Sequence, residues 1–281
     1  MSRNVAVSTA LFDGYEMALA FDEIAAAGCQ RVEPAFIAGY TDFTEATFSE
    51  TTARQLAKQA KSAGVTIAAV SAHMDLGAAD AETSTRLERR IHFVSACGSK
   101  VLISNAGLVQ DADRIAQRLE LVVPLCEQLG IMLALENPGH GTGSLIHDVQ
   151  SGQAFLKRFE HSSVRLNYDA GNVYSYSGGI QQPGNDLVEG GQRGIGYVHL
   201  KDLKLEAPDW IFCSIGEGDV NFGELLRVLE PDIPVSIELP LRLRRPGKGD
   251  PVRQREAIPL PALRTAMRDS LRAVALAQRR L

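Results

Sequence analysis

Short apolar runs alternate along the chain with longer segments in which apolar residues recur at helical spacing. The first run covers residues 5–10, and a helical pattern follows over residues 15–27. The second run covers residues 31–36, and its helical pattern occupies residues 51–63. A glycine follows each helical pattern, as is common where helices end. This order is typical of parallel strands joined by helices.

The same order continues to the end of the chain and predicts eight strand and helix units. The other expected strands are residues 65–72, 100–105, 131–136, 164–169, 195–199 and 235–238. The other expected helices are residues 83–97, 111–129, 148–159, 186–192, 222–230 and 261–278. No linker, low-complexity tract or break in composition divides the chain. Residues 1–281 are therefore predicted to form one α/β domain with the (β/α)8 TIM barrel fold.

Composition removes several alternatives to a globular enzyme. Hydrophobic residues make up 45% of the chain, enough for a sizeable core. The net charge of -5 comes from 34 acidic and 29 basic residues, so we expect no nucleic-acid partner and no anionic membrane surface. No apolar run is long enough for a membrane span, and Asp13 and Glu16 interrupt the N-terminal segment. A cytoplasmic protein is expected.

Two further motif classes are disfavoured. The four cysteines are widely spread without a CxxC pair, so we interpret them as buried reduced thiols. No GxGxxG follows the first strand, and the Gly-Glu-Gly of residues 216–218 lies late in the chain. A dinucleotide site therefore lacks its usual context.

Four consecutive expected strands end in side chains that can bind a metal ion. They are Glu136, Asp169, His199 and Glu238. Active sites of α/β barrels lie at the carboxyl ends of the strands, and neighbouring strands are only about 4.8 Å apart. Each residue alone also has a structural explanation, such as a salt bridge, a helix cap, a core histidine or a solvent-exposed carboxylate. Together they favour one shared ion, because unpaired charge at the barrel mouth is costly.

The donor set of three carboxylates and one imidazole limits which metal ions the site can bind. It suits one divalent metal ion, Mn²⁺, Mg²⁺, Co²⁺ or Zn²⁺, and it lacks the thiolates of a closed structural zinc site. Four protein ligands also leave coordination positions open for substrate oxygens.

Five short motifs resemble the xylose isomerase-like TIM barrel superfamily, the sugar phosphate isomerase/epimerase group. They are LALEN at 133–137, LNYDAGN at 166–172, YVHLKD at 197–202, GEGDVNF at 216–222 and VSIE at 235–238. The resemblance implies that Glu136, Asp169, His199 and Glu238 bind the metal. It also implies that Glu136 and Glu238 transfer protons and are the catalytic residues.

A second group of residues is predicted to bind substrate. His73 closes the third strand and could instead be an ordinary polar strand end or an added metal ligand. Asn172 stands where many relatives carry a histidine three residues after the aspartate. Lys201 and Asp202 follow His199 and could orient substrate or metal ligands, with a surface salt bridge as the alternative. For two weaker candidates, Glu33 and His140, a structural role is favoured.

Several functions remain open from the sequence. The first is an isomerase or epimerase that moves a proton beside the carbonyl of a small sugar-like substrate through an enediolate. The second is a dehydratase of an inosose-like or 3-dehydroshikimate-like substrate. A three-zinc AP endonuclease is disfavoured, because the resemblance would require ligands where this chain has Asn105, Asn172 and Asn221. A non-enzymatic ligand-binding barrel, and assembly as a homo-oligomer, also remain open.

The segment after the last strand, residues 241–256, is rich in cations. They are Arg242, Arg244, Arg245, Lys248, Arg253 and Arg255. Loops at this place in barrels frequently bind anionic groups, so a carboxylate or phosphate on the substrate is one interpretation. The alternative is a mobile surface loop or a subunit contact.

Overall fold

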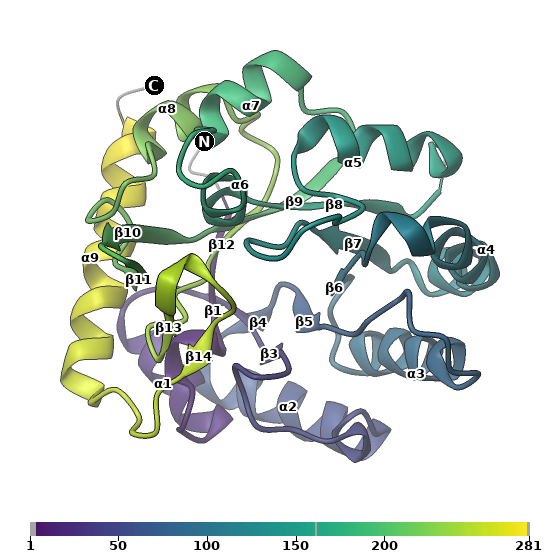
Figure 1. Ribbon diagram of the computed structural model, residues 1–281. Coiled ribbons are helices and arrows are strands. Elements are labelled where there is room, and N and C mark those ends of the chain that lie inside the picture. Colours follow the sequence, from purple (N-terminus) through teal and green to yellow (C-terminus); the bar gives the residue numbers. More distant parts are fainter. Residues whose placement is uncertain (1–3, 161, 280–281) are drawn as a thin grey trace.

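In the computed structural model, which describes residues 4–160 and 162–279, a ring of parallel strands is surrounded by helices (Figure 1). The strand order is β3-β5-β6-β7-β8-β9-β12-β1-β2-β4. The strands are β1 Val5–Ser8, β2 Arg31–Glu33, β3 Ala35–Phe36, β4 Thr66–Ile67, β5 Val70–Ala72, β6 Val101–Asn105, β7 Met132–Glu136, β8 Val164–Asp169, β9 Ile195–Leu200 and β12 Val235–Ile237.

The ring closes because two of the predicted strands are each divided in two. β2 pairs with β4 and β3 pairs with β5, which joins the two ends of the sheet order. Pro34 separates β2 from β3, since proline has no N–H to donate to a strand ladder. β2 and β3 are the two halves of the strand predicted at residues 31–36, and β4 and β5 are the two halves of the strand predicted at residues 65–72. The prediction of a (β/α)8 TIM barrel is confirmed.

Helices follow the strands and cover the outside of the ring. They are α1 Met17–Ala26, α2 Glu50–Ala63, α3 Thr83–Ala96, α4 Ala112–Leu129, α5 Val149–Leu156, α6 Ala170–Tyr176, α7 Pro183–Gly190, α8 Phe222–Val228 and α9 Leu260–Arg279. Local chemistry explains the ends of α2, where the Ser49 hydroxyl accepts from the Thr52 N–H and Gly64 adopts the left-handed conformation.

Some boundaries differ from the prediction. β1 ends at Ser8, and the expected continuation becomes a 3-10 helix, Thr9–Phe12, whose first turn the Ser8 hydroxyl caps. α6 is not predicted, because it begins directly after β8 without an intervening loop. Asp169, the last residue of β8, caps this helix by accepting the Asn172 N–H. These departures arise from side chains that bond to nearby backbone, a signal that hydrophobic spacing does not contain.

A second sheet, which we call the mouth sheet, lies against the carboxyl end of the ring and is not predicted from the hydrophobic pattern. Its strands are β10 Asp202–Glu206, β11 Asp209–Cys213, β13 Leu243–Arg245 and β14 Val252–Arg253, in the antiparallel order β10-β11-β13-β14. Figure 1 shows these strands grouped together at the side of the ring. Arg253 ties β14 to the loops after β1 and β3, since it pairs with Asp13 at 2.5 Å and with Asp42 at 2.7 Å.

Alternation along the ring strands places the candidate chemistry inside the barrel. Ala134 and Tyr197 belong to a small buried cluster made of strand residues. Side chains two positions apart share a face of a strand, so Glu136 lies above Ala134, and His199 and Lys201 lie above Tyr197. The interior therefore changes from apolar to charged toward the carboxyl ends of the strands.

Gly171, at the start of α6, allows this helix to approach β9. A Cβ atom there would lie 2.2 Å from the Lys201 carbonyl oxygen. We expect Gly171→Ala to destabilise the protein by about 1–3 kcal/mol through overpacking, measured by denaturant unfolding. Gly223→Ala in the first turn of α8 is the matched control. Beyond its own helix backbone and chain neighbours, its Cβ would come no closer than 3.6 Å to a heavy atom, the Oδ1 of Asn221. A similar loss there would contradict this explanation.

Candidate metal centre

Four side chains from successive strand ends meet inside the barrel mouth. Glu136, Asp169 and His199 lie at the ends of β7, β8 and β9, and Glu238 directly follows β12. Each offers one ligand atom, and these atoms all lie within 4.8 Å of one another. All four residues are at most 3% exposed. Among the described residues this is the one group of three or more side chains able to hold a metal ion.

The spacing of these atoms is close to that of ligands on a single ion. His199 Nδ1 lies 3.0 Å from Glu136 Oε2, 3.7 Å from Glu238 Oε2 and 3.8 Å from Asp169 Oδ2. Bonds from a divalent metal to nitrogen or oxygen are roughly 2.0–2.2 Å long, so two ligands of one ion lie about 3–4 Å apart. Small adjustments of the side chains would bring all four into coordination distance.

Glu33 holds the His199 ring in place from behind. Its carboxylate lies 3.1 Å from His199 Nε2 and accepts a hydrogen bond of 3.0 Å from the Ser71 hydroxyl. Both Glu33 and His199 are fully buried. When a metal ion is bound, an Nε2–H donated to Glu33 would leave the Nδ1 lone pair directed at the ion, which is the arrangement found behind many metal-binding histidines.

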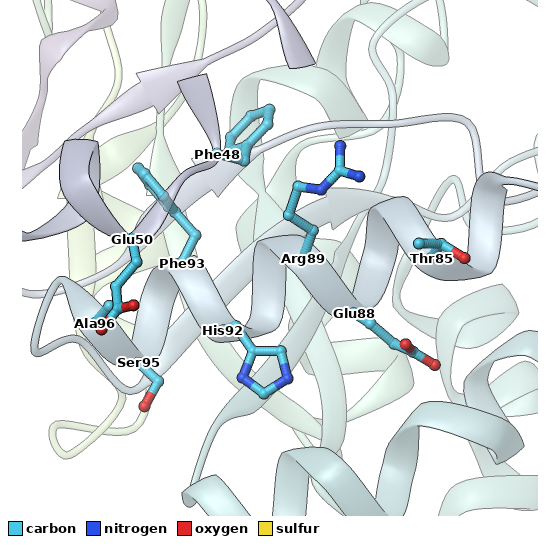
Figure 2. A pocket seen from close by; sticks show the side chains of 9 residues that line it. All are labelled: Phe48, Glu50, Thr85, Glu88, Arg89, His92, Phe93, Ser95 and Ala96. Carbon is cyan, nitrogen blue, oxygen red and sulfur yellow. The ribbon is translucent and has the colours of Figure 1, made fainter. Parts of the chain in front are cut away.

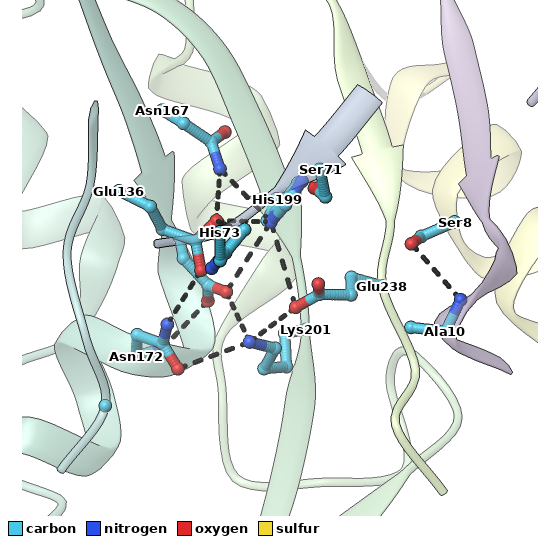
Figure 3. Close-up of polar contacts among 12 residues, drawn as sticks. Ser8, Ala10, Ser71, His73, Glu136, Asn167, Asn172, His199, Lys201 and Glu238 are labelled. Atoms are coloured by element: carbon cyan, nitrogen blue, oxygen red, sulfur yellow. Dashed lines mark hydrogen bonds and ion pairs between the residues drawn. The ribbon is translucent and has the colours of Figure 1, made fainter. Parts of the chain in front are cut away.

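Lys201 is a buried cation within the same cluster, as Figure 3 shows. Its Nζ lies 2.6 Å from Asp169 Oδ2 and 2.5 Å from Glu238 Oε2. Burial favours the neutral amine, but Asp169 and Glu238 raise the pKa of Lys201 well above its ordinary value. Lys201 therefore remains an ammonium that partly balances the carboxylates.

The cluster still carries excess negative charge. Burial, together with the charges of Glu136 and Glu238, raises the pKa of Asp169 to about 7 against the attraction of Lys201. For Glu136 burial acts in the same direction, yet His199 and the other cations lower its pKa to about 2. Neighbouring carboxylates thus compete for too few cations.

The available oxygen atoms fit a divalent cation. Glu238 Oε1 is buried without a hydrogen-bond or ion-pair partner among the described residues, whereas Asp169 Oδ2 and Glu238 Oε2 have ion pairs with Lys201 and His199. Buried carboxylate oxygens normally have partners, so the unpartnered Glu238 Oε1 fits a site for a cation. The set of three carboxylates and one imidazole suits a hard or intermediate divalent ion.

Comparison with known protein families agrees with the barrel fold. The sequence model of the family described as xylose isomerase-like TIM barrel matches residues 21–258. The chain belongs to this family. No curated protein sequence matches the chain significantly.

Solved structures share the fold of this xylose isomerase-like barrel at low sequence identity. An L-ribulose 3-epimerase structure has a TM-score of 0.72 at 16% identity, covering 99% of this chain and 95% of the other. D-psicose 3-epimerase with D-tagatose from Clostridium cellulolyticum H10 has a TM-score of 0.74 at 15% identity, covering 98% and 99%. The probable 3-DHS dehydratase AsbF from Bacillus anthracis has a TM-score of 0.69 at 14% identity, covering 97% and 98%. Such identities establish the fold alone.

A pocket of about 210 Å³ opens onto the candidate metal centre of the xylose isomerase-like barrel. Glu136 and Glu238 line it, together with His73, Asn172 and Lys201, whereas Asp169 and His199 are not among its lining residues. A larger groove of about 680 Å³ lies elsewhere, over α3 and the start of α2 (Figure 2). It contains none of the predicted site residues, so the smaller pocket is the candidate site.

Two of the predicted substrate-binding residues lie beside Glu136 in this pocket. His73 is 7% exposed, and its Nε2, 3.7 Å from Glu136 Oε2, has no hydrogen-bond partner among the described residues. Asn172 donates to Glu136 Oε1 at 3.3 Å and accepts from Lys201 Nζ at 3.4 Å. Both side chains therefore present polar atoms at the pocket floor.

Asp202 lies outside the pocket lining and organises a loop instead. Its carboxylate accepts the backbone N–H groups of Leu203, Gly216, Gly218 and Val220 at 2.8–3.3 Å. Burial raises the pKa of Asp202 to about 6, although these four N–H donors oppose the shift. Neither Asp202 nor Lys201 forms the surface salt bridge that the sequence left as an alternative.

Two asparagines that contact the candidate ligands are not predicted as site residues from the sequence. Asn167 donates to Glu136 Oε2 at 2.6 Å and lies 3.1 Å from His199 Nδ1. Asn137 exchanges two hydrogen bonds with the backbone of Asp169, at 2.9 and 3.0 Å. Asn167 carries a usable signal, because it lies two residues before Asp169 and therefore on the same inward face of β8.

The weaker candidates have different outcomes. Glu33, for which a structural role is favoured from the sequence, contacts His199 directly. His140 lines the outer part of the pocket, with Nε2 at 3.9 Å from the exposed Asp250 carboxylate. Asn105 also lines the pocket, at the end of β6.

Among the described residues, no helix combines the length and the apolar character needed to cross a membrane.

Proposed function

We propose that the chain is a divalent-metal-dependent isomerase or epimerase of a small, sugar-like hydroxy-carbonyl substrate. One observation carries the proposal: of the four clustered ligands, the two glutamates line the pocket, whereas Asp169 and His199 lie behind them. Two carboxylates that can take up and release protons are therefore placed next to a bound molecule. Two of the similar structures, an L-ribulose 3-epimerase and a D-psicose 3-epimerase, support this substrate class.

Glu136, Asp169, His199 and Glu238 would hold one divalent ion, Mn²⁺, Mg²⁺, Co²⁺ or Zn²⁺. When bound, the ion would polarise the substrate carbonyl and stabilise negative charge on its oxygen. Glu33 keeps the His199 ring oriented toward the ion. Lys201, which stays protonated, and the uncharged Asn172 are placed to donate hydrogen bonds to substrate oxygens.

The proton transfers fall to the two glutamates. One ionised carboxylate removes the proton from the carbon beside the carbonyl, and the electron pair moves toward the carbonyl oxygen to give an enediolate. The other glutamate, protonated, returns a proton to carbon from its own side of the substrate. Glu136 and Glu238 approach from β7 and β12, with β8 and β9 between them in the ring, so they can act on different faces.

We expect turnover in heavy water to place deuterium at one carbon of the product. The purified protein loaded with Mn²⁺ would be screened against ketoses and their acidic or phosphorylated derivatives, with NMR detection of exchange at the carbon beside the carbonyl. A dehydratase would instead release water and form a conjugated product that absorbs in the ultraviolet, as the similarity to the AsbF structure would allow. Metal-dependent reaction without exchange at carbon would contradict the proposed proton transfer.

A further inference from the structure

The cations of residues 241–256 differ in how they are neutralised. Most have partners in the protein: Arg242 and Arg253 with Asp13, Arg244 with Asp209, Arg255 with Glu256, and Lys248 over the Trp210 ring. These contacts account for their charges without a ligand. Arg245 is the exception in this segment.

Arg245 is only 3% exposed, yet no carboxylate of the described residues lies within ion-pair distance of its guanidinium. Its Nε donates to the Gly249 carbonyl and its Nη2 to the Lys248 carbonyl, both at 2.9 Å. A guanidinium has five N–H donors, so these bonds leave others free. The guanidinium nitrogen without a hydrogen bond, Nη1, is not fully enclosed by protein, so it is accessible to water or to a ligand. A mostly buried guanidinium without an acidic partner is a favourable place for an anion.

The mouth sheet directs Arg245 toward the barrel. Arg245 on β13 is paired with Trp210 on β11, and paired residues project from the same face of a sheet. The Trp210 ring packs against Tyr174 of α6 at 5.6 Å between centroids, so this face points to the barrel. Arg244 projects to the opposite face, with about half of its side chain exposed.

Arg245 also lies near the outer part of the pocket. Tyr40, His140 and Pro251 all line that part. Arg245 itself is not among the lining residues, but its Nε is hydrogen-bonded to the carbonyl of Gly249, two residues before Pro251. The guanidinium therefore lies beside the segment that forms this part of the wall, and its charge contributes, after burial, to a lowered pKa of His140. The pocket therefore has carboxylates at its floor and a cation near its rim.

We propose that Arg245 binds an anionic group, a carboxylate or a phosphate, at the end of the substrate remote from Glu136 and Glu238. This inference rests on the proposed function and narrows its substrate to an acidic or phosphorylated sugar-like molecule. The hydroxy-carbonyl end of such a molecule would occupy the metal centre, and its anion would pair with the guanidinium near the rim. Guanidinium and carboxylate or phosphate match as paired donors and acceptors.

The test compares three probes that carry no carbonyl and so cannot turn over: xylitol, xylitol 5-phosphate and xylonate. Their affinities for the full chain loaded with Mn²⁺ would be measured by calorimetry. We expect at least one anionic probe to bind about 10- to 100-fold more tightly than xylitol, as charge-assisted hydrogen bonds predict. The anion with the larger preference identifies the group that Arg245 binds.

Matched variants locate the effect. Arg245→Gln should remove most of the preference for the anion, whereas Arg244→Gln, the neighbour on the opposite face, should keep it. Arg245→Lys retains the charge without the paired donors and should keep part of the preference, which preserves the test if Arg245→Gln does not fold. Thermal unfolding and Mn²⁺ titration of each variant show that the fold and the metal centre are intact.

Two results would overturn the inference. Equal affinity for xylitol and both anions would refute it and leave the proposed isomerase or epimerase standing. So would an unchanged preference in folded Arg245→Gln. Metal-dependent binding of none of the three probes would count against both the inference and the proposed function.

Discussion

Replacing either pocket glutamate by glutamine is expected to lower turnover by on the order of 100-fold or more, since a positioned acid or base contributes about that much. Glu136→Gln and Glu238→Gln keep the size of the side chain but cannot take up the substrate proton. The loss should appear in kcat on the substrate identified by the heavy-water screen. Deuterium exchange at carbon should fall with it.

Metal occupancy must be measured in the same variants, because both glutamates are also proposed ligands. Elemental analysis at saturating Mn²⁺ separates a lost ligand from a lost proton transfer. Glu206→Gln is the control, since Glu206 ends β10 on the surface and pairs with Lys204. If both pocket variants turned over at nearly the parent rate, the glutamates would serve as ligands only.

Affinity for Mn²⁺ is expected to fall strongly when a direct ligand is removed and less when a residue behind a ligand is changed. Asp169→Ala and His199→Ala each remove a direct ligand and should weaken Mn²⁺ binding most. Glu33→Gln removes only the carboxylate behind His199 and should cost roughly 10- to 100-fold, as changes to residues behind metal ligands do. Calorimetric titration of Mn²⁺ into the purified variants measures both effects.

In these variants, weaker metal binding caused by unfolding can be distinguished from weaker binding caused by the loss of a ligand. Asp169 also caps α6 through the Asn172 N–H, so thermal unfolding is needed for each variant. Asp113→Ala is the control, because the Asp113 side chain is 93% exposed and pairs with Arg158 outside the cluster. Parent-like Mn²⁺ affinity in both Asp169→Ala and His199→Ala would show that the metal is held elsewhere.

The ring of strands is predictable from sequence because its signal is local. Apolar runs such as β7 and β8 end in a carboxylate, and a charged group at the end of a buried strand has to lie at the barrel mouth. The four candidate ligands follow from that one rule. Their mutual distances do not, since these depend on how tightly the ring closes.

Other parts of the site depend on contacts between distant segments. Lys201 is two residues after His199 and shares its inward face, but only the structure shows it between Asp169 and Glu238. Glu33 contacts His199 across the ring, 166 residues away in the chain. Neither partner can be chosen from spacing along the sequence.

The mouth sheet escapes prediction for a related reason. In β10, Leu203 and Leu205 alternate with charged residues, which is a usable strand signal, but β13 and β14 are only three and two residues long. The pairing of β13 with β11 joins segments that follow different ring strands, and β14 pairs only with β13. Short, charged strands of this kind are stabilised by their partners more than by their own composition.

The pairing of β11 with β13 makes the segment after β9 and the segment after β12 depend on each other. β11 has β10 on one side and β13 on the other, so exchanging the segment after β12 alone would leave a β11 edge with unpaired N–H and C=O groups. An exposed edge of this kind invites association with other chains. Residues 202–213 and 243–253 therefore form one transplantable module, and redesign of this barrel for a new substrate should exchange them together.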